Sequence, residues 1–229
     1  MRRLFSIFAF ALLATTAVSP AYADDFSGAY VADTIGGALS SSKDFDTSPT
    51  NPNCWWCASN FGGKSASVVT GAQMGYNFRY QMFLVGLEGE YNFGKLNSGA
   101  SDPIYKFPTY RTTTGAMGDI VMRLGVVYDK TLFYAKIGYG LADQQVSWTD
   151  TSYSAYANGT RNLSGAVFGG GVEYALNSTW SLKAEYERFQ FGGTTVMNVQ
   201  NYPGTYQQVI KNQPIDLFKV GIAFHFGAN

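Results

Sequence analysis

The sequence predicts an all-β fold, namely an eight-stranded antiparallel up-and-down transmembrane β-barrel. Charged residues make up 14% of the chain and aromatic residues 16%, whereas soluble domains carry about 25% charged residues. Strand-like segments recur along the chain, and the connections between them are alternately short and long. Within the segments, apolar residues return at every second position, which gives a strand one apolar face and one polar face. These three observations are typical of a barrel that faces lipid outside and a polar lumen inside.

The first 23 residues have the pattern of a cleaved signal peptide. They begin with Met1 and two arginines, continue with an apolar run over residues 4–18, and end on the A-x-A motif Ala21-Tyr22-Ala23. The apolar run is too short to span a bilayer as a helix. We therefore expect export and one barrel domain over residues 24–229. Cleavage leaves fourteen basic against sixteen acidic residues, a net charge of −2, which gives no basic footprint for nucleic acid.

The connections between the expected strands indicate how the chain crosses the membrane. The strands lie near residues 26–39, 66–79, 82–95, 113–128, 132–144, 162–175, 179–191 and 215–226. The tight connections are 80–81, 129–131 and 176–178, and the long ones are 40–65, 96–112, 145–161 and 192–214. Outer-membrane barrels have short periplasmic turns and long extracellular loops. A secreted soluble β-sandwich, the alternative fold, has no reason to collect its long connections at one end.

Seven of the eight segments divide into an apolar face and a face of charges and glycines, while the first segment alternates poorly. In chain order, the apolar faces carry Val68, Ala72, Met74, Tyr76 and Phe78; Phe83, Val85, Leu87, Tyr91 and Phe93; Ile120, Met122, Leu124, Val126 and Tyr128; Phe133, Ala135, Ile137, Tyr139 and Leu141; Ala166, Phe168, Val172 and Tyr174; Trp180, Leu182, Ala184 and Tyr186; and Phe218, Val220, Ile222, Phe224 and Phe226. Glycines gather on the opposite face, where a narrow barrel leaves little room for side chains.

The polar faces place ten charged residues in the expected lumen. The acidic members are Glu88, Glu90, Asp119, Glu173, Glu185 and Glu187, and the basic members are Arg123, Lys136, Lys183 and Lys219. Isolated buried charges cost several kcal/mol, so these residues must pair or stay hydrated. They form either an ion network that fills the barrel or the charged constriction of a small pore. Eight strands enclose only enough space for side chains, which favours the network.

The two cysteines lie close together in the first long connection. Cys54 and Cys57 form a CxxC motif in a chain expected in an oxidising compartment. The motif fits a small structural disulfide, a redox centre or half of a zinc site. The segment shows no helix start to activate a thiol, and the single histidine, His225, lies far along the chain. We expect the disulfide, and we expect no metal and no cofactor.

Catalysis has little support in the sequence. His225 falls at the periplasmic end of the last strand, so it cannot form a Ser-His-Asp site at the outer rim. Chemistry based on carboxylates alone, with Glu88, Glu90, Glu185 or Glu187, is the remaining enzymatic alternative. A structural role for these residues is the stronger interpretation.

Short segments of the chain resemble a known family. The segments GAYV at 28–31, VGLEGEYNF at 85–93, MRLGVVY at 122–128, LFYAKIGYG at 132–140 and GGVEY at 170–174 resemble the small porin-like outer-membrane proteins of alpha-proteobacteria. These are immunogenic or opacity-type surface antigens with an OmpA-like transmembrane barrel. The last strand also resembles the signal read by the outer-membrane insertion machinery, through Lys219, Gly221, Phe224 and Phe226.

The resemblance implies a non-enzymatic, surface-exposed structural protein of the Gram-negative outer membrane. Its implied partners are outer-membrane lipid and lipopolysaccharide, the insertion machinery, and a host or environmental ligand that the long loops contact. Two alternatives remain at this point. One is a small porin that passes ions or small solutes through the charged lumen, and the other is an enzyme that modifies outer-leaflet lipid.

Overall fold

The structure is a computed structural model, and it describes most of the expected barrel. The described residues are 26–47, 61–101, 109–151, 154–192, 194–198, 200, 207–211 and 214–226. The expected signal peptide and the pair Cys54 and Cys57 lie outside them. Among the described residues, no helix is long and apolar enough to cross a membrane.

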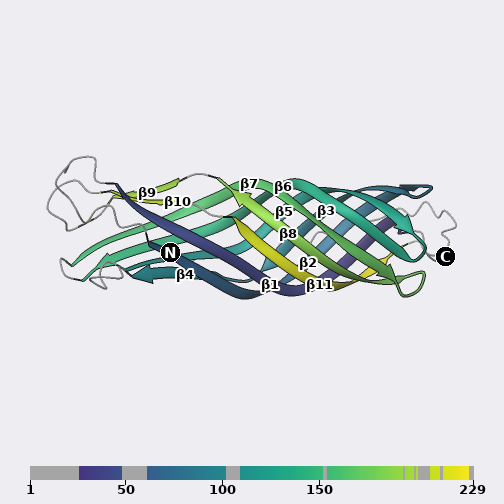
Figure 1. Ribbon diagram of the computed structural model, residues 1–229, viewed down its shortest axis with the longest axis horizontal. Helices are drawn as coiled ribbons and strands as arrows, with labels where there is room; N and C mark the ends of the chain where they lie inside the picture. The colour runs from purple at the N-terminus through teal and green to yellow at the C-terminus, as the bar shows by residue number, and fades with distance from the viewer. Residues whose placement is uncertain are drawn as a thin grey trace, which may run out of the picture.

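Eight long strands form a closed ring (Figure 1). They are β1 (Gly28–Thr47), β2 (Phe61–Tyr80), β3 (Phe83–Phe93), β5 (Thr109–Tyr128), β6 (Thr131–Asp150), β7 (Ala155–Ala175), β8 (Trp180–Phe191) and β11 (Ile215–His225). Each pairs antiparallel with the next, and β11 pairs with β1, for example Phe224 with Val31. Three shorter strands, β4 (Leu96–Ser101), β9 (Thr194–Asn198) and β10 (Gln207–Lys211), extend the wall. β4 pairs with β5, and β10 pairs with both β1 and β9. The predicted all-β fold is confirmed.

The three tight turns are where the sequence predicts them, and they lie at one end of the barrel, the turn end. Gln81 and Asp129 take the left-handed backbone conformation, with φ of 56° and 51°, which short hairpin turns require. In the third turn the Oδ1 of Asn177 accepts hydrogen bonds from the backbone N–H groups of Thr179 (2.9 Å) and Trp180 (2.8 Å). Asn closes turns in this way because its short side chain reaches the backbone just ahead of it.

The opposite end, the loop end, corrects the predicted connections. β6 continues to residue 150 and β7 begins at residue 155, so the long loop predicted over 145–161 is wrong and the connection is 151–154. Strands also occupy parts of the other three long gaps. The cause is a reversal of polarity along the strand. Val146 and Trp148 point inward and are 3% exposed, while polar neighbours such as Ser147 face outward, so the composition imitates a loop.

At the loop end the outward side chains form a polar wall. Between this wall and the turn end, a band of apolar side chains surrounds the outside of the barrel. The residues assigned to the apolar faces of the strands point outward, and most of the large ones are exposed, including Phe78, Phe133, Tyr139 and Leu141. On β6 the band covers residues 133–141. A tilted strand needs about 9–11 residues to cross a bilayer once, so this length fits one crossing. The outside of the barrel is therefore shaped for lipid.

One charged residue interrupts this band and explains why the first segment alternates poorly. Asp33 of β1 is exposed on the outward face between Val31 and Ile35. It is in register with Ala72 of β2 and Ile222 of β11. Ile222 is the middle of the five outward apolar residues between Phe218 and Phe226, so Asp33 lies near the middle of the band. A carboxylate there is costly, although less so than an Arg or Lys.

We predict that Asp33→Leu stabilises the barrel in a lipid bilayer. The expected gain in the free energy of unfolding is about 1–2 kcal/mol, below the about 2–4 kcal/mol attached to Arg or Lys at the midplane. Urea unfolding of protein refolded into lipid vesicles, followed by heat-dependent gel mobility, measures it. Asp143→Leu is the matched control, because Asp143 is exposed on the polar part of the wall and should change little. A loss of stability in the Asp33 variant alone would contradict the assigned orientation.

Candidate functional site

The interior of the barrel contains a layer of charged side chains, here called the charged layer. It comprises Glu88 and Glu90 from β3, Asp119 and Arg123 from β5, Lys136 from β6, Glu173 from β7, Lys183, Glu185 and Glu187 from β8, and Lys219 from β11. These are the ten residues that the period-2 pattern places in the lumen. Each is at most 7% exposed, so the layer is closed to bulk solvent.

Arg123 lies at the turn end of the charged layer and is completely buried. Its Nη2 is 2.9 Å from Oε2 of Glu173, and its Nη1 is 3.6 Å from Oε2 of Glu88. The guanidinium carbon lies 3.9 Å from the ring centroid of Tyr134 and 5.1 Å from that of Tyr30. The plane of an arginine head fits carboxylates at its edge and aromatic rings on its faces. Both contacts compensate for the water that the guanidinium loses on burial.

Each lysine of the layer joins carboxylates from different strands. Lys136 Nζ lies 2.6 Å from Oε1 of Glu88 on β3 and 2.6 Å from Oε1 of Glu187 on β8. Lys219 Nζ lies 2.5 Å from Oε2 of Glu187 and also pairs with Glu90. Because these contacts span the lumen, the charges connect parts of the wall that are not neighbours in the sheet.

Lys183 and three residues absent from the predicted set complete the layer. Lys183 Nζ is 3.0 Å from Oε1 of Glu185 and donates a 2.5 Å hydrogen bond to Oε1 of Gln73. Tyr134 Oη donates to Oε1 of Glu185 at 2.6 Å, and Tyr30 Oη donates to Glu88. The period-2 count through β1, β2 and β6 would have found Tyr30, Gln73 and Tyr134, which share the inward face with the charges.

Asp119 is the member that the structure does not pair. Its carboxylate belongs to a group with Glu90 and Glu187 in which the ligand oxygens lie within 4.8 Å of one another. Neither oxygen of Asp119 has a hydrogen-bond partner among the described residues. Glu90 and Glu187 already bind Lys136 and Lys219, so the trio presents no free pair of carboxylates to a metal ion.

His225 lies at the turn end, as predicted, with Ser181 and Glu173 beside it. Its Nε2 is 2.8 Å from Oε1 of Glu173 and 3.1 Å from Oγ of Ser181, while Ser181 Oγ donates to the same Glu173 oxygen at 2.6 Å. In a catalytic triad the serine and the carboxylate contact opposite ring nitrogens. Here both contact Nε2, and Nδ1 has no partner in the described part of the chain. This geometry is that of a structural hydrogen-bond cluster.

Apolar side chains fill the lumen on both sides of the charged layer. Toward the loop end lies the loop-side apolar layer, which includes Ala38, Val69, Leu96, Met117, Ala142, Leu163, Val167, Phe189, Phe191, Ile215 and Leu217. Toward the turn end lies the turn-side apolar layer, formed by Phe26, Leu84, Val127, Leu132, Tyr134 and Ala175. The lumen is thus apolar, charged and apolar in sequence along its axis. The aromatic pair Phe189 and Phe191 was missed, although both continue the inward face of Glu185 and Glu187.

The residues of the expected assembly signal lie along the contact between β11 and β1. Lys219 belongs to the charged layer. A Cβ on Gly221 would be 2.5 Å from the carbonyl oxygen of Asp33 and 2.7 Å from Cγ2 of Thr34, so only glycine fits there. Phe224 and Phe226 face outward with ring centroids 5.0 Å apart. These placements show how β11 closes the ring, while the role in insertion stays a prediction.

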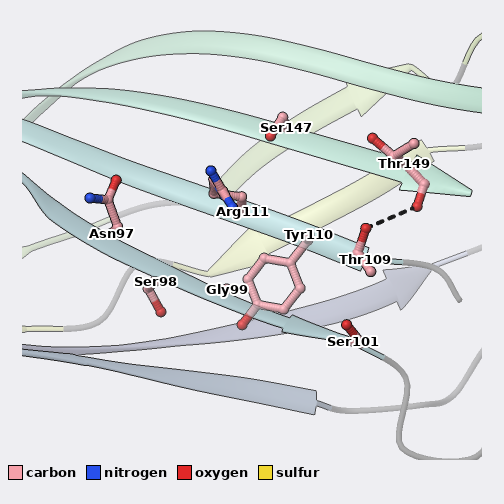
Figure 2. A pocket seen from close by; sticks show the side chains of 9 residues that line it. All are labelled: Asn97, Ser98, Gly99, Ser101, Thr109, Tyr110, Arg111, Ser147 and Thr149. Carbon is pink, nitrogen blue, oxygen red and sulfur yellow. Dashed lines mark hydrogen bonds between the residues drawn. The ribbon is translucent and has the colours of Figure 1, made fainter. Parts of the chain in front are cut away.

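A second candidate site lies outside the barrel, on the polar wall at the loop end. A hollow of about 840 Å³ is lined by Asn97, Ser98, Gly99, Ser101, Thr109, Tyr110, Arg111, Ser147 and Thr149 (Figure 2). A hollow of about 370 Å³ on the other side of Arg111 is lined by Arg111, Thr113, Gln145, Val146, Ser147, Asn158, Gly159 and Thr160. The sequence assigned all of these residues except Thr113 to loops and predicted no particular site among them.

Comparison with known proteins decides the family. The family described as "Outer membrane protein beta-barrel domain" matches residues 8–217. The chain belongs to this family. Two similar sequences are 31 kDa outer-membrane immunogenic proteins of Brucella melitensis and Brucella suis, each 27% identical over 146 residues. The match covers 60% of this chain and 59% of each relative. The predicted resemblance and the outer-membrane location are confirmed.

Solved structures with this fold share little sequence with the chain. The outer membrane protein OprG from Pseudomonas aeruginosa is 9% identical with a TM-score of 0.56, and the match covers 86% of this chain and 95% of OprG. The outer membrane protease OmpT from Escherichia coli is 8% identical with a TM-score of 0.50, covering 86% of this chain and 97% of OmpT. Identities this low show the fold alone. In such barrels the turn end is periplasmic and the loop end extracellular.

We predict that Arg123→Met strongly destabilises the barrel. The substitution leaves Glu173 and Glu88 buried without their guanidinium partner, and breaking a buried pair costs about 3–5 kcal/mol. Urea unfolding of protein refolded into lipid vesicles measures the change. Arg188→Met is the control, because that arginine is 44% exposed and 3.6 Å from Asp216, so its loss should cost about 0–1 kcal/mol. Equal losses in the two variants would mean that the charged layer is hydrated.

Proposed function

We propose that the protein is a non-enzymatic structural component of the outer membrane whose extracellular end is exposed at the cell surface and whose lumen does not conduct. The order of layers inside the barrel carries this proposal. A charged layer held by ion pairs lies between two apolar layers, and none of the three has the character of an aqueous path. The charges therefore act as internal cross-links.

The apolar layers are the stronger argument against a pore. An ion that passes the loop-side apolar layer must shed water among Phe189, Phe191 and Leu217, whose side chains have no polar atom to replace the lost hydration. The packing is also tight. A Cβ on Gly140 would be 2.7 Å from Cδ1 of Phe189 and 2.8 Å from Cγ2 of Val167, so these side chains occupy the space in front of Gly140 on the inner face.

Two further observations favour a surface component over an enzyme. The cluster of Ser181, His225 and Glu173 lacks the arrangement of a hydrolytic triad, and it lies at the periplasmic end, away from the outer leaflet. The Brucella relatives are named as immunogenic outer-membrane proteins, which supports exposure of the corresponding barrel at the cell surface. Contacts with an environmental partner would then be made by the extracellular wall and its connections.

We predict that the refolded protein gives no single-channel conductance in planar lipid bilayers. Protein that shows heat-dependent gel mobility, and is therefore folded, is added to the bilayer under a voltage ramp. A general porin added afterwards to the same bilayer confirms that insertion and detection work. Reproducible conductance steps from the wild-type barrel would overturn the closed-lumen proposal and restore the small-porin alternative.

We further predict that Phe226 takes part in recognition by the insertion machinery. Phe226→Asp places a charge near the periplasmic edge, where the folded-state cost is about 0–1 kcal/mol, so refolding into detergent should stay normal. Insertion in cells, measured by outer-membrane fractionation and heat-dependent mobility, should fall sharply. Phe83→Asp is the control, since Phe83 is also an exposed aromatic residue beside a periplasmic turn. Normal insertion of the Phe226 variant would contradict a role for Phe226 in recognition.

A further inference from the structure

The immediate neighbours of Arg111 on the outer wall are uncharged. In the sheet it is in register with Gly99 on β4 and Ser147 on β6, and Ser147 is in register with Asn158 on β7. The other outward residues around it are Asn97, Ser101, Thr109, Thr113, Gln145, Thr149, Tyr156 and Thr160. All are small or polar and uncharged. Within the described part of the chain, Arg111 makes no ion pair, and the nearest outward acid along β6, Asp143, is four residues from Ser147, about 13 Å of strand.

A break in the regular pairing turns this arginine outward. β5 and β6 change register between Thr114 and Met117, which is a β-bulge. Arg123 points into the lumen, and an unbroken strand would point Arg111, an even number of residues away, inward as well. On the loop-end side of the bulge, Thr112 is the buried residue, at 4% exposure, and Arg111 is exposed. Bulges often re-aim a side chain beside a functional site.

The wall is hollowed on both sides of the arginine. Gly99 has no side chain and Ser147 a short one, so the two hollows of about 840 Å³ and 370 Å³ meet at Arg111. Figure 2 shows its head between Asn97 and Ser147, with the hydroxyls of Thr109 and Thr149 along the same wall. The guanidinium is therefore accessible from both flanks and is surrounded by groups that donate and accept hydrogen bonds.

This combination selects an anionic saccharide. A guanidinium binds phosphate or sulfate through paired N–H donors, while hydroxyl and amide side chains match the hydroxyls of a sugar. Tyr110, the aromatic residue of the larger hollow, is 2% exposed and offers no ring face to an apolar ligand. The charge of the wall agrees, since Lys64 and Lys95 are also exposed on it.

The height of the site indicates where that saccharide comes from. Ser147 lies six residues beyond Leu141, the last outward apolar residue of β6, which is about 20 Å of strand. With a strand tilt of 35–45°, Arg111 sits about 15 Å above the edge of the lipid-facing band. We propose that the Arg111 hollow binds a phosphorylated sugar of outer-leaflet lipopolysaccharide, with the guanidinium on the phosphate. This inference rests on the proposed function, because it requires the loop end to be extracellular.

Binding of rough-type lipopolysaccharide to the refolded full-length barrel in detergent tests the proposal. Arg111→Gln should weaken binding about tenfold or more, as expected for loss of a charged hydrogen bond. Ser147→Leu, which fills the hollow and keeps the charge, should weaken it as well. Lys130→Gln, which removes one exposed charge at the periplasmic turn, is the control and should bind like wild type. Dephosphorylated lipopolysaccharide should bind wild type no better than it binds Arg111→Gln.

The outcomes separate the alternatives. Wild-type affinity in Arg111→Gln, or an equal loss in Lys130→Gln, overturns the site. Inositol hexakisphosphate serves as a soluble anion: binding that depends on Arg111 for this probe, without binding of lipopolysaccharide, overturns the lipid source. Heat-dependent mobility of each variant shows that it is folded. A failure here with a non-conducting wild-type barrel leaves the proposed function intact, whereas conductance by wild type refutes that function independently.

Discussion

Closure of the sheet is the constraint on which the rest of the structure depends. In lipid each backbone N–H and C=O needs a partner within the protein, and a strand wall meets that need only when its two edges join. β11 therefore returns to β1, and Gly221 on β11 and Gly36 on β1 let the two strands approach. A ring of eight strands leaves room inside for side chains alone. Every large residue on the inward face must then fit against residues from across the lumen.

The charged layer makes this fit specific. Buried ion pairs add little net stability compared with apolar residues of the same volume, because desolvation offsets most of the attraction. They do penalise wrong arrangements. Lys136 requires both Glu88 on β3 and Glu187 on β8, and a slip of one residue in either strand would turn those carboxylates toward lipid. The layer thus favours one register around the ring, while the apolar layers on either side keep water from weakening it.

Features set by the pattern within a single strand could be predicted from the sequence, whereas contacts between strands could not. Alternation is a property of a single strand, so the outward face and the ten interior charges could be identified from sequence. The partners Glu173 and Tyr30 of Arg123 could not, because they lie on β7 and β1, which do not pair with β5. Strand lengths were underestimated because polarity reverses beyond the membrane, where Ser147 faces water and Trp148 fills the lumen. The outward position of Asp33 was missed because a charge on the lipid face breaks the apolar alternation by which that face is recognised.

The two arginines of β5 have different surroundings, and these give one a structural role and leave the other available for binding. Arg123 is enclosed by two carboxylates and two aromatic rings, so its charge is already used within the fold. Arg111 lies twelve residues away, and the bulge between Thr114 and Met117 moves it from the lumen to the outer wall. Its neighbours there are glycine, serine and threonine, none of which neutralises a charge. Turning this residue outward spares the fold a buried unpaired charge, and it also leaves the guanidinium exposed on a wall that can contact anionic saccharides.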